Sequence, residues 1–115
     1  MKSPGFTFYP KDWISSSTVT EMTGDQVKSY IYLISAAWLQ DERATLPADD
    51  FKLAKLARVS LEEWQVMKPL IMTKFQKNDR GRLVNDRLWE EHAKQLKRSA
   101  AASRNVSSRY QPPTN

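Results

Sequence analysis

Residues 53–64 spell LAKLARVSLEEW, and the predicted fold depends on this stretch. Its first five residues place apolar side chains on one helical face, as the last turns of a helix do. Ser60 and Glu63 then form a capping-box pattern, and Val59 and Trp64 have the spacing of a hydrophobic staple. A second helix therefore begins directly after a tight link, and the sequence predicts a helix-turn-helix pair.

Further elements are predicted on the N-terminal side of this pair. Thr23 and Gln26 form a second capping box, and apolar residues at three- and four-residue spacing follow it, which predicts a core helix over residues 24–39. Residues 45–47 are expected to form a brief strand. Residues 6–13 alternate aromatic and polar side chains at their start, which indicates a strand or an extended aromatic arm.

On the C-terminal side, the pattern changes to a small β-hairpin over residues 75–85, with Gly81 supplying the positive φ of a tight loop. Asn85 or Asp86 is placed to cap a fourth helix. Residues 103–115 lack an apolar face and contain two adjacent prolines, so we expect this segment to be disordered.

Together these elements predict a mainly α domain with a small β-hairpin, an α+β fold of winged helix-turn-helix type. It carries an N-terminal extended aromatic arm and a long C-terminal helix. Pro69 is expected to kink the second helix of the pair or to shift its last turn. We assign residues 1–92 to this domain, and residues 93–115 to a basic helical extension with a disordered, proline-containing tail. All four tryptophans are expected in the core.

The positive charge of the chain is unevenly distributed. The 115 residues carry a net charge of +5, with a pI near 9.6. Residues 93–115 hold five Lys and Arg and no acidic residue, whereas residues 1–92 hold 13 basic and 13 acidic residues. A polyanionic partner would therefore have to bind a local patch or the tail.

Local cation clusters suggest where DNA would bind. The hairpin and its flanks are basic, and hairpin cations can lie along phosphates. Two simpler explanations stay open: Lys and Arg on a hairpin protect edge strands, and cations suit a helix C-terminus. Glu62 and Glu63 in the first turn of the second helix argue against base reading by that helix. The predicted DNA-binding residues are Lys68, Lys74, Lys77, Arg80, Arg82, Arg87, Lys94, Lys97 and Arg98.

Enzyme chemistry has little support in the sequence. There is no cysteine, His92 is the one histidine, and three glycines form no phosphate-binding loop. Asp49 and Asp50 are adjacent, and capping of a helix explains them. We therefore expect no catalytic activity, no cofactor and no bound metal. Because no secretory signal or membrane-spanning run is visible, we expect a cytoplasmic protein.

Several short motifs follow one another along the chain: FYPKDW at 8–13, YIYLI at 30–34 with Trp38, LPAD at 46–49, LAKLARVS at 53–60 with Glu63-Trp64, and Phe75 ahead of GRLVNDR at 81–87. In these motifs and their order the sequence resembles the YdaU-like domain of phage and prophage proteins, a domain of unknown function, over about residues 6–92. One departure is Lys28-Ser29-Tyr30, where that family usually has Gly-Ala-Tyr. The resemblance implies a winged-helix-like domain at the N-terminus of phage replication-initiation or replisome-organiser proteins, and it implies no catalytic residues.

Two functions are consistent with these observations. The first is a DNA-binding module of a phage or prophage replication-initiation protein, which contacts the backbone through the hairpin and the tail. The alternative is an adaptor that docks another replisome protein without touching DNA. Phe6, Tyr9 and Tyr32 would then be candidate anchors, together with Met72.

Overall fold

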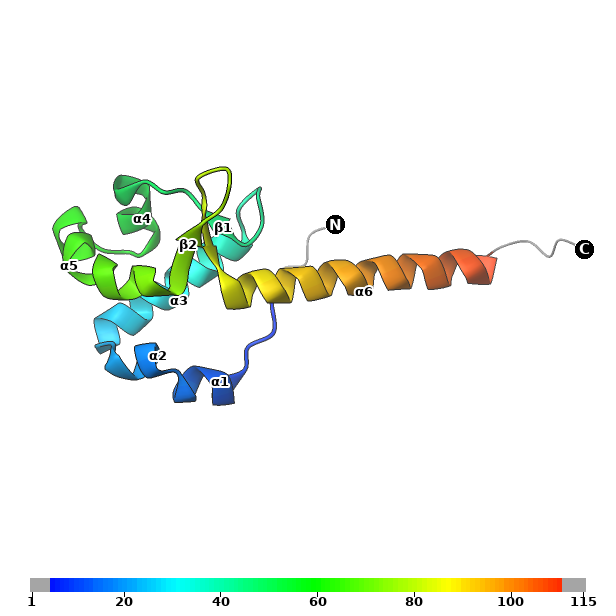
Figure 1. The fold of residues 1–115 in the computed structure, drawn as a ribbon, viewed down its shortest axis with the longest axis horizontal. Coiled ribbons are helices and arrows are strands. Elements are labelled where there is room, and N and C mark those ends of the chain that lie inside the picture. Colours follow the sequence, from blue (N-terminus) through cyan, green and yellow to red (C-terminus); the bar gives the residue numbers. More distant parts are fainter. Residues whose placement is uncertain (1–4, 111–115) are drawn as a thin grey trace, which may run out of the picture.

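The computed structural model describes residues 5–110, and for Thr18 and residues 102–110 it describes the backbone alone. The fold is mostly helical with a small antiparallel sheet, which confirms the α+β prediction. Figure 1 shows α3 crossing the body and α6 running out from it. In chain order the elements are α1 (Pro10–Ser15), α2 (Ser17–Glu21), α3 (Gly24–Trp38), β1 (Thr45–Leu46), α4 (Asp50–Leu56), α5 (Leu61–Ile71), the 3-10 turn η1 (Met72–Lys74), β2 (Phe75–Lys77), β3 (Leu83–Asn85) and α6 (Asp86–Tyr110).

Both predicted capping boxes are confirmed. The backbone N–H of Gln26 donates to Thr23 Oγ1 at 3.3 Å, and that of Thr23 donates back to Gln26 Oε1 at 2.9 Å. Ser60 and Glu63 exchange the same pair of bonds at 3.1 Å each. Pro69 does not end α5; the helix continues for two residues and then tightens into the 3-10 turn η1.

The sheet has the strand order β1-β3-β2, and both pairings are antiparallel. Leu46 pairs with Leu83 on one side of β3, and Gln76 pairs with Val84 on the other. The predicted hairpin is therefore confirmed, with Gly81 at φ +76°, and the predicted brief strand joins it as a third member. This pairing brings the segment after α3 against the hairpin.

The core lies between α3, the helix pair and the sheet. Trp38 and Trp64 are its largest members, with 1% and 0% of their surface exposed. Trp13 packs at the edge, half-buried. The expectation that all four tryptophans are core residues is wrong for Trp89, which is 42% exposed and packs on the ring of His92 one turn further along α6.

The extended arm is shorter than predicted. Residues 5–9 have no regular structure, but α1 begins at Pro10, in the middle of the stretch expected to be extended. A proline at the first helical position costs no hydrogen bond, and Asp12 adds a favourable charge to the first turn. Phe6 still packs on the core, with its ring centroid 5.3 Å from that of Trp38.

His92 sits where α6 crosses the end of α3. Its ring meets Trp38 and Trp89 at centroid distances of 6.1 and 5.3 Å. Desolvation, with a smaller contribution from the nearby Arg43 charge, holds the His92 pKa below its ordinary value of 6.5.

Stability is therefore expected to fall on acidification below pH 6.5. In that range the unfolded chain takes up a proton on His92 that the folded chain resists, so the free energy of unfolding decreases as pH decreases. Urea denaturation at pH 7.5 and pH 5.5 measures the loss. His92→Gln should show a smaller loss between these two pH values, and an equal loss would contradict the assignment to His92.

Candidate nucleic-acid interface

A Schellman motif closes the turn between α4 and α5. The N–H of Val59 donates to the carbonyl of Ala54 at 3.0 Å, and the N–H of Arg58 donates to that of Lys55 at 3.1 Å. This geometry puts Arg58 at φ +64°, in the left-handed region that glycine normally occupies. An arginine there costs roughly 1 kcal/mol of backbone strain, so its side chain is a candidate for a function.

The same turn is fastened to α3. Ser29, fully buried, donates its hydroxyl to the carbonyl of Ala57 at 2.9 Å. The guanidinium of Arg58 lies over the ring of Tyr32, 5.0 Å from its centroid, and Lys28 Nζ donates to the carbonyl of Arg58 at 3.4 Å. The helix pair is thus held in one orientation by contacts outside the pair.

Three cations lie on α4 and on the turn that follows it. Phe51, Lys55 and Arg58 follow one another at four- and three-residue spacing, with Lys52 beside them, and all four are exposed. We call these four residues the α4 face. None of its three cations forms an ion pair within residues 5–110 as far as side chains are described, and Phe51 is 69% exposed. A phosphate could therefore reach Lys52 and Lys55 without displacing an internal partner, whereas Arg58 already lies over the ring of Tyr32.

Arg80, at the tip of the β2–β3 hairpin, is in a different situation. Its Nε and Nη2 donate to the two carboxylate oxygens of Glu42 at 2.9 and 3.0 Å, and Nη1 lies 3.2 Å from Asp79 Oδ1. The hydrogen bond from Arg80 holds the pKa of Glu42 below its ordinary value. The charge of this arginine is already matched by two acidic residues of the same chain.

Arg82 is also engaged internally. Its Nε donates to Thr45 Oγ1 at 2.8 Å and its Nη2 donates to Gln40 Oε1 at 3.1 Å, so it ties the hairpin to the loop after α3. The loop between β2 and β3 is ordered by Asn78, whose side-chain oxygen accepts hydrogen bonds from the backbone N–H groups of Arg80 and Arg82 at 2.9 Å each. These two arginines hold the hairpin in place.

The other predicted DNA-binding cations are scattered over the body. Lys74, Lys77 and Lys97 make no ion pair with any side chain that the structure describes. Each of the remaining four has a contact within the chain. Lys68 lies 3.0 Å from Asp50, Arg87 lies 2.7 Å from Asp12 and Arg98 lies 4.0 Å from Glu91. The Nζ of Lys94 lies over the ring of Tyr9, 5.7 Å from its centroid. The structure therefore does not gather the nine predicted residues into one site.

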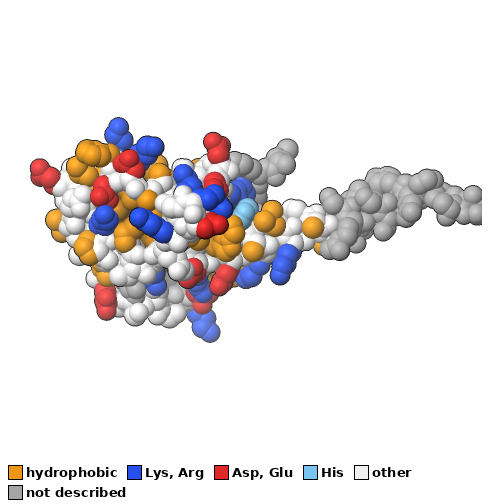
Figure 2. Space-filling model, turned by 45° about the horizontal axis from the view of Figure 1, so that its top comes forward, with side chains coloured by type: hydrophobic (Ala, Val, Ile, Leu, Met, Phe, Trp, Pro, Cys, Tyr) orange, Lys and Arg blue, Asp and Glu red, His pale blue; other side chains and the backbone are white. Residues whose placement is uncertain are grey.

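The charge pattern of the surface agrees with this description. Figure 2 shows acidic and basic side chains interspersed over the face of the body in view, with hydrophobic side chains between them. Ion pairs such as Arg80–Glu42 and Lys68–Asp50 account for part of this mixing. A cationic surface for a polyanion must therefore be local, and the α4 face is such a surface.

The comparison with known families supplies an identification. The model of a family described as a protein of unknown function, DUF1376, matches residues 5–93. The chain belongs to the DUF1376 family. No curated protein and no solved structure matches it significantly. The matched region covers the body and ends in the second turn of α6, close to the boundary at residue 92 that the charge distribution suggests.

The α4 face of this DUF1376 domain was missed by the sequence reasoning. In the sequence, Lys52, Lys55 and Arg58 are the residues off the apolar side of the first helix of the pair, and the helical periodicity does not distinguish them further. A local signal was present: Lys55 has no acidic residue three or four positions away, so no partner on its own helix competes for it. Hairpin cations looked equally free in the sequence, because their partner Glu42 is 38 residues away from Arg80.

Metal and membrane sites find no support in the part of the DUF1376 domain that is described. Within residues 5–110 no group of three or more His, Cys, Asp or Glu side chains is placed to hold a metal ion. No helix among the described residues combines the length and the apolar character needed to cross a membrane. The acidic residues instead cap helices or pair with cations.

Proposed function

We propose that this domain is a winged-helix module that binds DNA through the phosphate backbone, in the cytoplasm, as part of a phage or prophage replication-initiation protein. The element order α3-β1-α4-α5-β2-β3 supports the fold, because a helix-turn-helix pair is followed by a hairpin that serves as the wing. The phage and replication context rests on the resemblance of the sequence to YdaU-like domains.

The observation that carries the proposal is the α4 face. Lys52, Lys55 and Arg58 are exposed and form no ion pair with any side chain that the structure describes, while the hairpin arginines and Lys68 are matched by acidic residues. In Figure 1, α4 and the β2–β3 loop rise toward the same side of the body. A duplex bound along that side would contact mainly the cations of the α4 face, and Lys77 of the hairpin in addition.

The outward side of α5 explains why backbone contact is proposed instead of base reading. Glu62 is exposed in its first turn, and Val66 is 81% exposed. Gln65, the best base-edge reader near the helix start, donates to Asp50 Oδ2 at 3.4 Å, and Lys68 pairs with the same carboxylate. Binding should therefore depend strongly on salt and weakly on sequence.

Fluorescence anisotropy on a labelled duplex across a salt series tests the proposal. We expect Lys52→Ala with Lys55→Ala to weaken binding about tenfold or more at low salt, and to lower the salt slope by about two, because each lysine releases about one counterion. Arg80→Ala with Arg82→Ala removes the same net charge and is the matched control. Its loss should be at least about three times smaller, since these arginines are already paired.

Two outcomes would contradict different parts of the proposal. If the wild-type chain does not bind duplex at low salt, DNA binding is wrong. If it binds and the two double variants lose affinity equally, the contact surface is not the α4 face. Circular dichroism of each variant confirms that the fold is kept before affinities are compared.

A second candidate function is a protein-docking adaptor of a phage replisome. The observation that favours it is the combination of exposed apolar side chains, Phe51 and Val66, with the acidic start of α5. This alternative predicts no salt-dependent DNA binding, and a complex with a replisome protein that Phe51→Ser or Val66→Ser weakens.

A further inference from the structure

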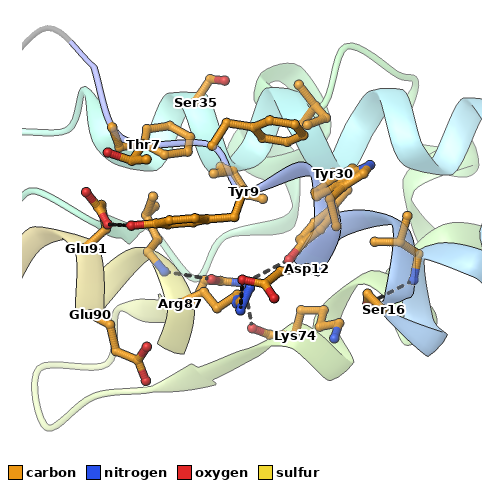
Figure 3. A pocket seen from close by; sticks show the side chains of 18 of the residues that line it. Thr7, Tyr9, Asp12, Ser16, Tyr30, Ser35, Lys74, Arg87, Glu90 and Glu91 are labelled. Carbon is orange, nitrogen blue, oxygen red and sulfur yellow. Dashed lines mark hydrogen bonds and ion pairs between the residues drawn. The ribbon is translucent and has the colours of Figure 1, made fainter.

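A pocket of about 570 Å³ lies between the N-terminal arm, α1, α3 and the first turns of α6. Figure 3 shows the ring of Tyr9 extending across it, with Glu91 at one end and Tyr30 at the other. A cavity of this volume lies in the range of sites that hold small molecules, so it has ample room for a single amino-acid side chain. This pocket is independent of the α4 face and of the proposed DNA binding.

Aromatic rings form much of its lining. Trp13 stacks on Tyr30 with centroids 5.4 Å apart and planes 11° from parallel, and Phe8 leans on Trp13 at 5.8 Å. Phe8 is 52% exposed and Tyr9 is 43% exposed. Exposed aromatic faces of this kind attract cations through their quadrupoles, and the Nζ of Lys94 already lies 5.7 Å from the centroid of Tyr9.

Glu91 adds a buried carboxylate whose partners are weak. The residue lines the pocket and is only 4% exposed. The Tyr9 hydroxyl donates to its Oε2 at a long 3.4 Å, while its Oε1 accepts no hydrogen bond from any residue that the structure describes and lies 4.0 Å from Arg98 Nη2. A buried carboxylate normally accepts several hydrogen bonds, because desolvation without them is costly. Glu91 is therefore an acceptor without sufficient donors.

The other charged residues of the lining form two opposite-charge pairs and leave one lysine over. Asp12 and Arg87 form an ion pair at 2.7 Å, which leaves neither charge free. Glu90 and Lys94 follow each other on α6 at four-residue spacing, a favourable pair on a helix surface. The one further charged residue of the lining, Lys74, belongs to η1. Glu91 remains as the buried charge that a ligand would have to satisfy.

We propose that this pocket binds an arginine side chain presented by a partner polypeptide. The guanidinium would replace Arg98 as the cation of Glu91, whose side chain would have to turn because its Oε1 is covered in this structure, and its planar surface would lie against the rings of Tyr9 and Phe8. A guanidinium group has planar, paired N–H donors that fit a carboxylate, and a flat face that stacks on aromatic rings. One group therefore suits both the Glu91 carboxylate and the aromatic lining of the pocket. Arg98, outside the lining and 62% exposed at its side chain, would be displaced outward.

NMR titration with N-acetyl-arginine amide tests the proposal, read at the indole N–H of Trp13 and the amide N–H of Glu91. N-acetyl-citrulline amide, which has nearly the same shape and no charge, is the control ligand. We expect saturable shifts with the arginine probe and at least about tenfold weaker binding of the citrulline probe. Absence of saturable shifts with the arginine probe, or equal affinity for the two probes, would overturn the proposal.

Two variants of opposite expected effect sharpen this result. Glu91→Gln should weaken binding of the arginine probe about tenfold, whereas Arg98→Gln should strengthen it, because a competing cation is removed. If Glu91→Gln disturbs the fold, Phe8→Ala serves as the test variant in its place. Phe8 is exposed and lines the pocket, so its truncation should weaken binding of the probe. Binding unchanged by Glu91→Gln or Phe8→Ala in a folded variant would contradict the site. Since no nucleic acid is present, this outcome is separate from the DNA-binding test.

Discussion

Trp64→Ala is expected to lower the free energy of unfolding by about 3–5 kcal/mol, the range for deleting a buried aromatic side chain. Trp64 is fully buried between the helix pair and the core, and its indole N–H donates to Asp50 Oδ1 at 3.0 Å. The substitution removes packing from the core and takes a hydrogen bond from Asp50. A domain of this size has a total stability of about 5–15 kcal/mol, so much of it would be lost.

Urea denaturation followed by circular dichroism measures this loss, and Val66→Ala is the matched control. Val66 lies on the same helix but is 81% exposed, so its truncation should change stability by less than about 0.5 kcal/mol. Similar unfolding midpoints for the two variants would show that Trp64 does not hold the helix pair on the core.

The same substitution should also change the titration of Asp50. Its pKa lies below the ordinary value, chiefly because of the Trp64 hydrogen bond and then because of Lys68. A lowered carboxyl pKa stabilises the folded state above the ordinary carboxyl range, and this stabilisation is lost as pH falls. In Trp64→Ala the Asp50 pKa should therefore rise toward its ordinary value, which NMR titration can follow.

Features determined by neighbouring residues were predictable from the sequence. The capping boxes at Thr23 and Ser60 and the tight loop at Gly81 all appear where the sequence places them. Each depends on residues within a few positions, because a cap is a bond between a side chain and a backbone group three residues away. Local rules therefore gave most of the element boundaries.

Whether the predicted DNA-binding cations are free depends on contacts between residues far apart in the sequence. Capping and turn patterns, which involve neighbouring residues, do not predict such contacts. Arg80 looked free because Glu42 lies in another part of the chain, and Arg87 looked free because Asp12 is at the N-terminus. Only the fold brings each pair together. The Glu91 pocket has the same origin, since its lining comes from the arm, four α-helices, the 3-10 turn η1 and the end of β3.

Asn85 is expected to be the most sensitive polar residue of the fold. It is 4% exposed, and its side-chain oxygen accepts the N–H of Leu88 at 3.0 Å, capping α6. Its side-chain NH₂ group donates to the Tyr30 hydroxyl and to the carbonyl of Lys74, both at 3.0 Å. One amide therefore satisfies groups on α3, η1 and α6 at the point where these elements meet.

Asn85→Ala should accordingly lower the free energy of unfolding by about 2–4 kcal/mol, because it removes a helix cap and takes the donor from one buried and one half-buried acceptor. Thr23→Ala is the control: it removes an exposed cap of α3 alone and should cost about 1 kcal/mol. Thermal unfolding of both variants gives the comparison. The two losses would be equal only if the bonds to Tyr30 and Lys74 contributed nothing, and α6 would then be held by its cap and by apolar contacts such as that of Leu88.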